Sequence, residues 1–281
     1  MRVYVDSEQS PLREVLLGYA DNVRLHPTPL NSIQEYYFSS DPPRVDLIAR
    51  QHEEFVETLD RRGVRIHRPK RQLQAVNQIF VRDLLAVIHD RAVVCSLKEN
   101  LRSPEITALD ELIAQFHSPP LLVQEGTLEG GDVMIDGTTL FIGISTRTSL
   151  SAMHWLEEQF GGEVQVIPMF LKPPFLHLDV VLNLPGKGTV MLYPPAFEEW
   201  SLEVLRKRYR LLEVTAEEQF ASGTNILFLT TESVISQKRM TRINDLLRKE
   251  GFEVVELEYS ELCKFGGSFR CSACPLVREH S

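Results

Sequence analysis

The sequence predicts a single α/β domain, residues 1–281, folded as a five-bladed α/β propeller of similar units. Two observations support this fold class. A polar residue followed by two short apolar strands recurs four times, beginning near Arg82, Gly131, Leu178 and Thr224. Amphipathic helices separate these motifs. Units of this size cannot bury their apolar faces alone, so we expect them to pack side by side around one centre.

The polar residue at the head of each unit recurs at a nearly constant spacing. Asp83, Asp132, Asp179 and Asn225 are separated by 49, 47 and 46 residues. Another 46 residues lead to Cys271, where a fifth motif begins with the short strand of "CSACPLV". This fifth unit lacks a second strand and a helix. We therefore expect the N-terminal "REVLLGYA" to complete it and close the ring, which removes exposed strand edges.

Helices are predicted where apolar residues recur at three- and four-residue intervals. Ser103 followed by Pro104 is typical of an N-cap with proline at the first helical position. Glycine after the last apolar residue, as at Gly161 and Gly251, is typical of a helix C-terminus. The predicted helices span 45–63, 103–117, 148–162, 196–209 and 237–251.

A strand is expected after each helix, because β-branched and apolar residues are concentrated there. Each unit is then strand–strand–helix–strand. The alternative is an ordinary α/β protein whose units look alike by chance, which the constant spacing disfavours. The predicted strands span 64–69, 121–126, 164–170, 211–216 and 252–258.

Composition is that of a soluble globular protein, with 43% hydrophobic and 25% charged residues. No apolar run approaches the roughly 20 residues of a membrane helix, and the N-terminus lacks a secretory pattern. We therefore expect a cytoplasmic protein without a membrane partner. The net charge of −9 disfavours nucleic acid as a partner. Four cysteines in 281 residues indicate reduced thiols rather than a disulfide framework.

Equivalent strand ends of a propeller converge near its axis, which brings the heads of the units together. Glu129 and His177 lie next to these positions in the sequence. A cysteine nucleophile such as Cys271 needs a proton carrier nearby, and histidine suits this role near neutral pH. Carboxylates such as Asp83 and Asp179 suit a planar cation with several N–H donors, such as a guanidinium. The set predicts thiolate attack on a guanidinium carbon.

Four segments resemble, in order, the motifs of the guanidino-group-modifying enzymes, or penteins. This superfamily includes arginine deiminases, dimethylarginine dimethylaminohydrolases and amidinotransferases. The resemblance spans essentially the whole chain and implies the five-fold α/β propeller. The matching segments are "FVRD" (80–83), "LEGGDV" (128–133), "HLD" (177–179) and "GGSFRCSACPLVR" (266–278).

The resemblance also implies a role for each residue. Cys271 would be the nucleophile, and His177 would protonate the departing amine and later activate water. Asp83 and Glu129 would grip the guanidinium, with Asp179 holding either the guanidinium or His177. The residues expected to bind the α-carboxylate end of an amino-acid substrate are Asn77, Arg102 and Arg147.

The implied activity is hydrolysis of arginine or a close analogue to citrulline and ammonia, without a metal or cofactor. The expected partner is thus a small guanidino compound, and a homodimer stays open. Asn77 and the Arg82–Asp83 pair favour a deiminase, although the chain has no room for the helical insertion of arginine deiminases. The alternatives are dimethylarginine hydrolysis releasing dimethylamine, amidino transfer, and a ribosome-binding propeller like translation factor 6.

Several of these residues also have a purely structural interpretation. Cys271 is alternatively a buried structural thiol. Arg102 and Arg147 are alternatively solvated surface charges. For Asp132 the alternative is that it serves only the geometry of its turn. A zinc site is a further alternative, but zinc sites normally repeat the C-x-x-C pairing, which occurs here once. Its ligands would be Cys263, Cys271, Cys274 and His280.

Overall fold

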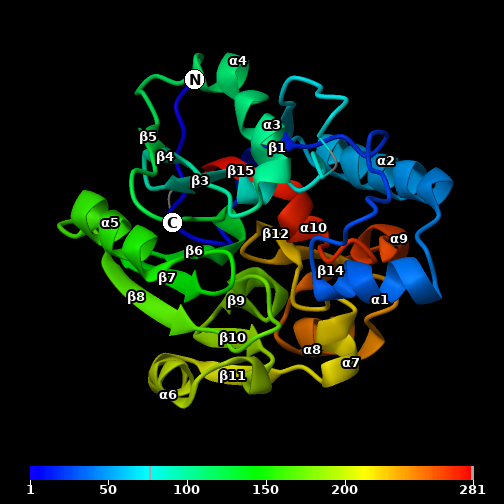
Figure 1. Cartoon of the computed structure of the whole chain (residues 1–281). Coiled ribbons are helices and arrows are strands. Elements are labelled where there is room, and N and C mark those ends of the chain that lie inside the picture. Colours follow the sequence, from blue (N-terminus) through cyan, green and yellow to red (C-terminus); the bar gives the residue numbers. More distant parts are fainter. Residues whose placement is uncertain (76, 280–281) are drawn as a thin grey trace.

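The computed structural model describes residues 1–75 and 77–279, and within them fifteen strands form five three-stranded sheets (Figure 1). In each sheet the first strand runs antiparallel to the second, and the second runs parallel to the third. Helical segments connect the second strand to the third in every sheet. The predicted strand–strand–helix–strand unit is therefore confirmed.

Four of the sheets are continuous in sequence. In each of them a short turn joins the first two strands, which are antiparallel. A longer helical connection joins the second strand to the third, because parallel strands require a crossover. The strands are β3 (Leu85–Ile88), β4 (Arg91–Val94) and β5 (Leu121–Leu122); β6 (Val133–Asp136), β7 (Thr139–Ile144) and β8 (Gln165–Phe170); β9 (Leu182–Gly186), β10 (Thr189–Leu192) and β11 (Arg210–Glu213); β12 (Leu227–Thr230), β13 (Ser233–Gln237) and β14 (Glu253–Leu257).

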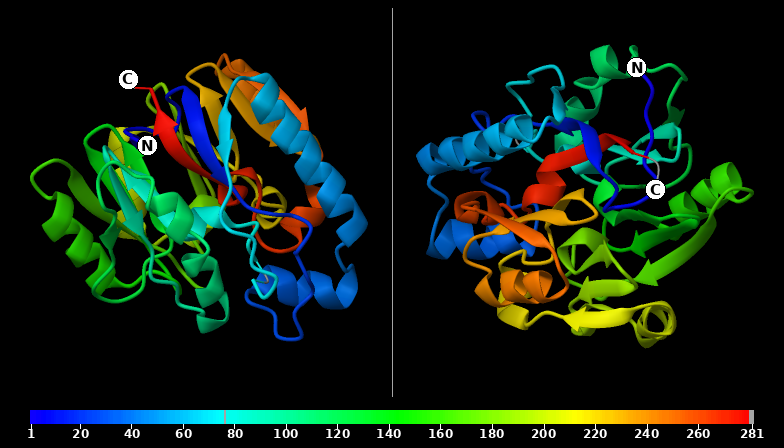
Figure 2. Two further views of the ribbon diagram at one scale, coloured as in Figure 1. Left: turned by 90° about the horizontal axis from the view of Figure 1, so that it is seen from above. Right: turned by 180° about the vertical axis from the view of Figure 1, so that it is seen from behind.

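The fifth sheet joins the two ends of the chain. Strand β1 (Leu12–Leu17) lies between β15 (Ala273–Arg278), to which it is antiparallel, and β2 (Arg65–His67), to which it is parallel. The two end strands lie side by side in both views of Figure 2. The prediction that the N-terminal segment completes the fifth unit is confirmed.

Helices occupy the predicted segments, with shorter bounds. The segment 103–117 is an exception, because it forms two short helices. There the Ala108 carbonyl accepts from Lys70 N–H at 2.8 Å, which withdraws it from the helical hydrogen-bond series. The helices are α2 (Val45–Arg61), α3 (Ser103–Thr107), α4 (Asp110–Ile113), α5 (Leu150–Phe160), α6 (Glu199–Arg208) and α8 (Thr241–Lys249).

Ser103 is not the N-cap that the sequence suggested. A 3₁₀ turn, η2 (Asn100–Arg102), runs directly into α3, so Ser103 is already helical. The glycine prediction holds better: Gly161 caps α5, and Gly251 follows α8 with a φ of +85°.

Four further helices were not predicted. The most important for the site is α1 (Ser32–Ser40), whose N-cap Asn31 accepts from the Gln34 N–H at 2.9 Å. A short helix with a capping box is α7 (Ala216–Phe220). The remaining two are α9 (Ser260–Cys263) and α10 (Phe269–Ser272).

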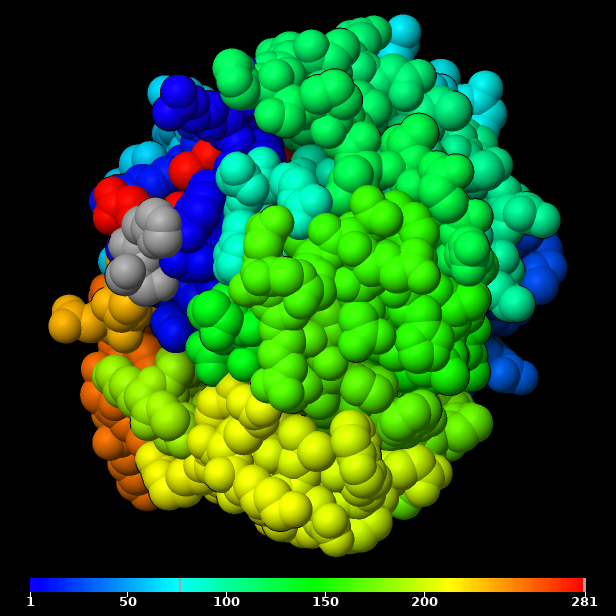
Figure 3. All heavy atoms as spheres, turned by 90° about the vertical axis from the view of Figure 1, so that its left-hand side faces the viewer, coloured from blue at the N-terminus to red at the C-terminus, as the bar shows by residue number. Residues whose placement is uncertain are grey.

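Consecutive sheets contact one another near the turns that begin them. The 3₁₀ turns η1 (Val81–Asp83), η3 (Gly130–Asp132) and η4 (Leu178–Val180) pack in that order. Asn183 of β9 donates to the Thr224 carbonyl, just before β12, at 2.9 Å. In the space-filling view, green residues of the second unit pack on yellow residues of the third (Figure 3).

The fifth sheet contacts both of its neighbours. Arg278 of β15 donates to the Phe228 carbonyl of β12 at 3.0 Å, and the Cys274 thiol donates to the Leu85 carbonyl of β3 at 3.0 Å. Between the sheets and their helices, buried apolar side chains form three clusters within the described residues. None of the helices in that part of the chain is long and apolar enough to cross a membrane.

Candidate active site

The predicted heads of the units lie in equivalent turns. Asp83 and Asp132 end η1 and η3, Asp179 lies in η4, Asn225 precedes β12, and Cys271 lies in α10. All five side chains are buried. Hydrogen bonds link neighbouring units here, since Asn225 Nδ2 donates to the Asp179 carbonyl at 3.1 Å. The spacing in the sequence therefore corresponds to a common place in the structure.

A small cavity, which we call the charged cavity, opens beside these turns. Six of the eight predicted site residues line it, whereas Glu129 and Asp179 lie behind its wall. The other lining residues come from the segments before α1 and α10 and from Phe80 and Leu176. The predicted residues that line the charged cavity are Asn77, Asp83, Arg102, Arg147, His177 and Cys271.

His177 and Glu129 form a tight buried pair. The ring Nε2 lies 2.6 Å from Glu129 Oε2, and Nδ1 lies 3.7 Å from Asp83 Oδ1. Burial favours the neutral ring, but the Asp83 and Glu129 carboxylates outweigh it and raise the pKa of His177 to about 10. The same pair lowers the pKa of Glu129 to about 2, against the effect of burial. His177 is therefore protonated and ready to donate at neutral pH.

Cys271 is held by side chains of the third and fourth units. Its sulfur lies 3.1 Å from Asn225 Nδ2 and 3.4 Å from Asp179 Oδ2. Its backbone N–H donates to Asn225 Oδ1 at 3.0 Å. Burial first, and then the charges of Asp179 and Asp83, raise the pKa of Cys271 well above its usual range. These surroundings favour the thiol form of Cys271, and a cation beside it would favour the thiolate.

Two carboxylate oxygens at the site are buried without a hydrogen-bond partner among the described residues. They are Asp83 Oδ1 and Asp179 Oδ1. A buried acceptor left unpaired is costly, so such atoms point to a missing donor. Both carboxylates also raise the pKa of Cys271 through their negative charge. A cation with N–H groups is therefore the donor that suits these oxygens best.

Arg102 and Arg147 are buried rather than solvated, so the surface interpretation of these two arginines is wrong. Arg102 donates to Asp83 at 2.7 Å and to Glu105 at 2.8 Å. Arg147 donates to Glu129 at 3.4 Å and also to the Leu30 carbonyl. Both guanidinium groups are therefore engaged with protein acceptors while they line the charged cavity.

Asp132 lies deeper and holds two turns together. Its carboxylate accepts from Ser145 Oγ at 2.8 Å and from Leu178 N–H, next to His177, at 2.7 Å. Burial raises the pKa of Asp132 to about 7. This geometry agrees with the structural interpretation of Asp132. Asp179 likewise does not orient the imidazole, because the described partner of the His177 ring is Glu129.

A buried ion network beneath Cys271 was not anticipated. Arg270 donates to Asp179 at 3.0 Å and to both oxygens of Glu8 at 3.0 and 3.1 Å. Burial disfavours a charged Glu8, but Arg270 lowers the pKa of this carboxyl to about 2. Arg270 stands directly before Cys271 in the sequence, which was a usable signal, whereas nothing local marks Glu8.

Two glycines allow the reacting groups to approach one another. A Cβ on Gly131 would lie 2.9 Å from the His177 ring and 3.1 Å from Asp83 Oδ1. A Cβ on Gly267 would lie 2.9 Å from the Cys271 Cβ and 2.7 Å from the Phe80 ring. Side chains at either position would separate the residues that the site brings together.

Metal-ligating geometry is limited to one group of side chains within the described residues. Asp83, Glu129 and His177 each place a ligand atom within 4.8 Å of the others. A metal ion would have to replace the 2.6 Å bond between His177 and Glu129. The alternative zinc site is not formed by the described cysteines, since the Cys274 thiol bonds to the Leu85 carbonyl. His280 lies outside the described residues.

Comparison with known families and sequences agrees with this chemistry. Residues 29–278 match the family described as N,N dimethylarginine dimethylhydrolase, eukaryotic. The uncharacterized protein YkgA of Bacillus subtilis is 34% identical over 97% of this chain and 94% of its own length. An arginine deiminase of Listeria welshimeri is 26% identical over 73% of this chain, which spans only 62% of that enzyme.

Solved structures share the fold at low sequence identity. SxtG, an amidinotransferase of Microseira wollei, has a TM-score of 0.84 at 19% identity, covering 99% of this chain and 98% of its own. The N-terminal domain of ArgZ, a cyanobacterial arginine dihydrolase, has a TM-score of 0.84 at 18% identity, covering 94% of this chain and 97% of its own. A dimethylarginine dimethylaminohydrolase has a TM-score of 0.76 at 19% identity, covering 94% and 99%.

Proposed function

Since this chain belongs to the N,N-dimethylarginine dimethylhydrolase family of guanidino-modifying enzymes, we propose that it hydrolyses the guanidinium group of arginine or a close analogue. The products are citrulline and ammonia. Because the chain belongs to a family of enzymes, we prefer this hydrolase activity to the alternative of a ribosome-binding propeller. The specific substrate is the part of this proposal that goes beyond family membership.

The observation that carries the proposal is the unpartnered oxygen Asp83 Oδ1, on a residue that lines the charged cavity together with Cys271. A guanidinium has N–H donors on three sides of a plane and can donate to this oxygen. Binding it also offsets the negative charge that keeps Cys271 protonated. The same cation therefore supplies a hydrogen bond to the unpaired acceptor and favours the thiolate form of Cys271.

The first half of the reaction forms a covalent intermediate. As the cation binds, the Cys271 thiol loses its proton to solvent, and the thiolate attacks the guanidinium carbon. The C–N bond to the departing nitrogen breaks, and His177 supplies the proton with which ammonia leaves. Glu129 keeps the ring oriented and positively charged before this transfer. An amidino-thioether on Cys271 remains.

The second half reverses these roles. Neutral His177 takes a proton from a water molecule, which attacks the same carbon. The C–S bond breaks, the thiolate of Cys271 is released, and the ureido product forms. Asn225 Nδ2, 3.1 Å from the sulfur, donates to the departing thiolate. Asn77, Arg102 and Arg147 line the charged cavity, and we assign them to the amino-acid end of the substrate.

A second candidate is hydrolysis of dimethylarginine to citrulline and dimethylamine, which the matching family description favours. The charged cavity suits the guanidinium of either substrate. The difference lies in the departing amine, so the two activities are separated by kcat/KM on the two substrates.

The proposal includes the architecture around the site. Each sheet contacts the next, and the fifth contacts the first through Cys274 and Leu85, which supports a closed five-bladed propeller in a single domain. In that arrangement the five equivalent turns surround one axis, and the charged cavity opens on it.

The test is to incubate the protein with arginine or dimethylarginine and to assay citrulline together with ammonia or dimethylamine. The proposal expects citrulline from at least one of the two, with stoichiometric release of the corresponding amine. Absence of citrulline from both substrates would contradict it.

A further inference from the structure

A second and larger cavity, of about 240 Å³, lies beside the charged cavity, and we call it the uncharged hollow. Asn31, Leu176 and Gly266 line both cavities, so the two share a wall. The remainder of its lining comes from the start of α1, the segment before His177, the end of η4, and the residues at and just after the end of α7. These lining residues are Ser32, Ile33, Pro174, Phe175, Val180, Gln219, Phe220 and Ser222.

The two neighbouring cavities differ in charge. Asp83, Arg102, Arg147 and His177 line the charged cavity, whereas none of the described residues that line the uncharged hollow carries a formal charge. Placing an ammonium or carboxylate in such surroundings is costly, because no opposite charge pairs with it. The hollow therefore suits an uncharged, apolar group and not the amino-acid end of arginine.

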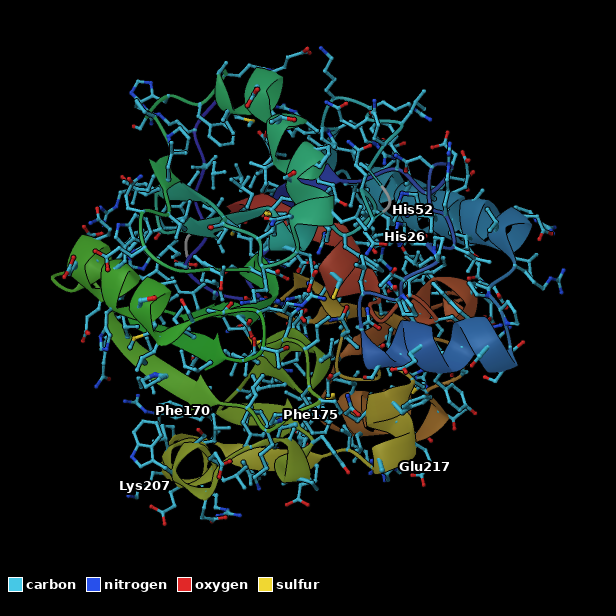
Figure 4. The ribbon with its side chains drawn as sticks, in the orientation of Figure 1. His26, His52, Phe170, Phe175, Lys207 and Glu217 are labelled. Atoms are coloured by element: carbon cyan, nitrogen blue, oxygen red, sulfur yellow. The ribbon has the colours of Figure 1, made fainter. Side chains whose placement is uncertain are left out.

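Packing outside the hollow fixes its walls. The Phe220 ring meets Tyr36 of α1 edge-on at a centroid distance of 5.2 Å, and Phe175 meets Tyr193 at 5.8 Å. Gln219 Nε2 donates to the Val180 carbonyl at 3.2 Å. In Figure 4 Phe175 lies toward α7 and α1, whereas Phe170 lies toward α6. The hollow is thus formed before any ligand enters it.

We propose that the uncharged hollow binds an apolar substituent carried by the guanidino group of the substrate, an alkyl chain or ring larger than a methyl group. This inference rests on the proposed hydrolase function and deepens it. The guanidinium carbon lies at Cys271 in the charged cavity, the amino-acid end lies toward Arg102 and Arg147, and the substituent extends past Leu176 and Gly266, which line both cavities, into the hollow.

The substituted nitrogen is the one that leaves. The Cys271 thiolate attacks the guanidinium carbon, the C–N bond to the substituted nitrogen breaks, and the alkylamine departs with the proton from His177. Water then attacks the same carbon, and the C–S bond breaks. Citrulline is therefore the product from both substituted and unsubstituted arginine. An apolar surface that receives the alkyl group in the transition state raises kcat/KM for the substituted substrate.

The experiment compares arginine with Nω-propylarginine through citrulline formation. Each propyl carbon that enters the hollow contributes to selectivity, so we expect kcat/KM for Nω-propylarginine to exceed that for arginine by about tenfold or more. Ser32→Phe, at the exposed first position of α1, fills the hollow and lowers this ratio by about tenfold. Ser39→Phe, on the same helix outside the hollow, is the matched control and leaves the ratio unchanged.

A second variant keeps the test decisive if Ser32→Phe fails to fold. Phe220→Ala widens the hollow and shifts the preference from propyl toward hexyl substituents. A wild-type ratio at or below one, or equal ratios in wild type and Ser32→Phe, overturns the inference while citrulline formation upholds the hydrolase function. Absence of citrulline from every substrate contradicts the proposed function itself.

Discussion

The charged cavity and the uncharged hollow share a wall but are built on opposite principles. In the charged cavity every cation faces an acid, and one carboxylate oxygen of a lining residue, Asp83 Oδ1, has no described hydrogen-bond partner. In the hollow the lining residues carry no charge and are held by packing outside it, as between Phe220 and Tyr36. Strong, directional interactions therefore position the reacting carbon, while the apolar surface distinguishes substrates by shape and size.

The two regions also differ in origin. The proposed reacting groups of the charged cavity, Asp83, His177 and Cys271, lie in or beside the turns that begin the sheets. The hollow is made from α1, α7 and the segment before His177. The comparison teaches that the repeated framework supplies the chemistry, whereas the segments that depart from the repeat supply the selectivity.

The largest effect is expected at the nucleophile. Cys271→Ser lowers citrulline formation by more than about 1,000-fold on every substrate, because a hydroxyl is a far weaker nucleophile than a thiolate. The variant still binds Nω-propylarginine more tightly than arginine, since the hollow is untouched; equilibrium binding measures this.

Cys274→Ser is the matched control for this substitution. Its thiol donates to the Leu85 carbonyl at 3.0 Å, and a hydroxyl can make the same bond. We expect this variant to keep its activity within about tenfold. Equal losses in Cys271→Ser and Cys274→Ser would remove Cys271 from the reaction.

Next in size is the support beneath the charged cavity. Arg270→Met leaves Glu8 and Asp179 as buried, unpaired acids, so the free energy of unfolding falls by about 3–5 kcal/mol. Urea unfolding measures the loss. Combining Arg270→Met with Glu8→Gln should cost less than the sum of the two single changes, because they share one ion pair. Strict additivity would contradict the network.

A smaller effect concerns the pH dependence of turnover. Glu129→Gln removes a charge that raises the pKa of His177, so that pKa falls from about 10. The acid form of His177 exists below its pKa, and the alkaline decline of kcat therefore moves to lower pH. We also expect kcat to fall by about 100-fold as the donor loses its orientation. An alkaline limb identical to that of the wild-type protein would exclude His177 as the acid.

The smallest effect is expected at the wall shared by the two cavities. Asn31→Ala removes the N-cap of α1 and lowers the free energy of unfolding by about 1 kcal/mol. Asn31→Asp keeps the cap but loses the 3.1 Å hydrogen bond to the Phe265 carbonyl. If urea unfolding shows equal losses in both variants, the cap is not the stabilising element there.

Much of the fold could be predicted from the sequence because the residues that mark each unit recur at a regular spacing. The regular spacing of Asp83, Asp132, Asp179, Asn225 and Cys271 corresponds to one turn at the head of each sheet. Long-range contacts account for the errors. The helix expected over 103–117 divides because a distant backbone N–H, that of Lys70, takes the Ala108 carbonyl.

The candidate site was predictable to the extent that it follows the same register. Six of the eight expected side chains line the charged cavity. Glu8 was out of reach, because it meets Arg270 across 262 residues of sequence and no local pattern marks the pairing. The hollow was equally hidden: Phe175 and Phe220 belong to segments that carry no repeat, so only their folded positions bring them together.

The central claim is that a planar cation activates Cys271 in the charged cavity. The most direct test compares alkylation by chloroacetamidine, whose amidinium is cationic and planar, with alkylation by neutral chloroacetamide, followed by peptide mapping. The account predicts that the cationic reagent labels Cys271 at least about 100-fold faster relative to a free thiol, and that a bound guanidino substrate protects it. Equal labelling by the two reagents, or labelling that such compounds do not slow, would contradict the account.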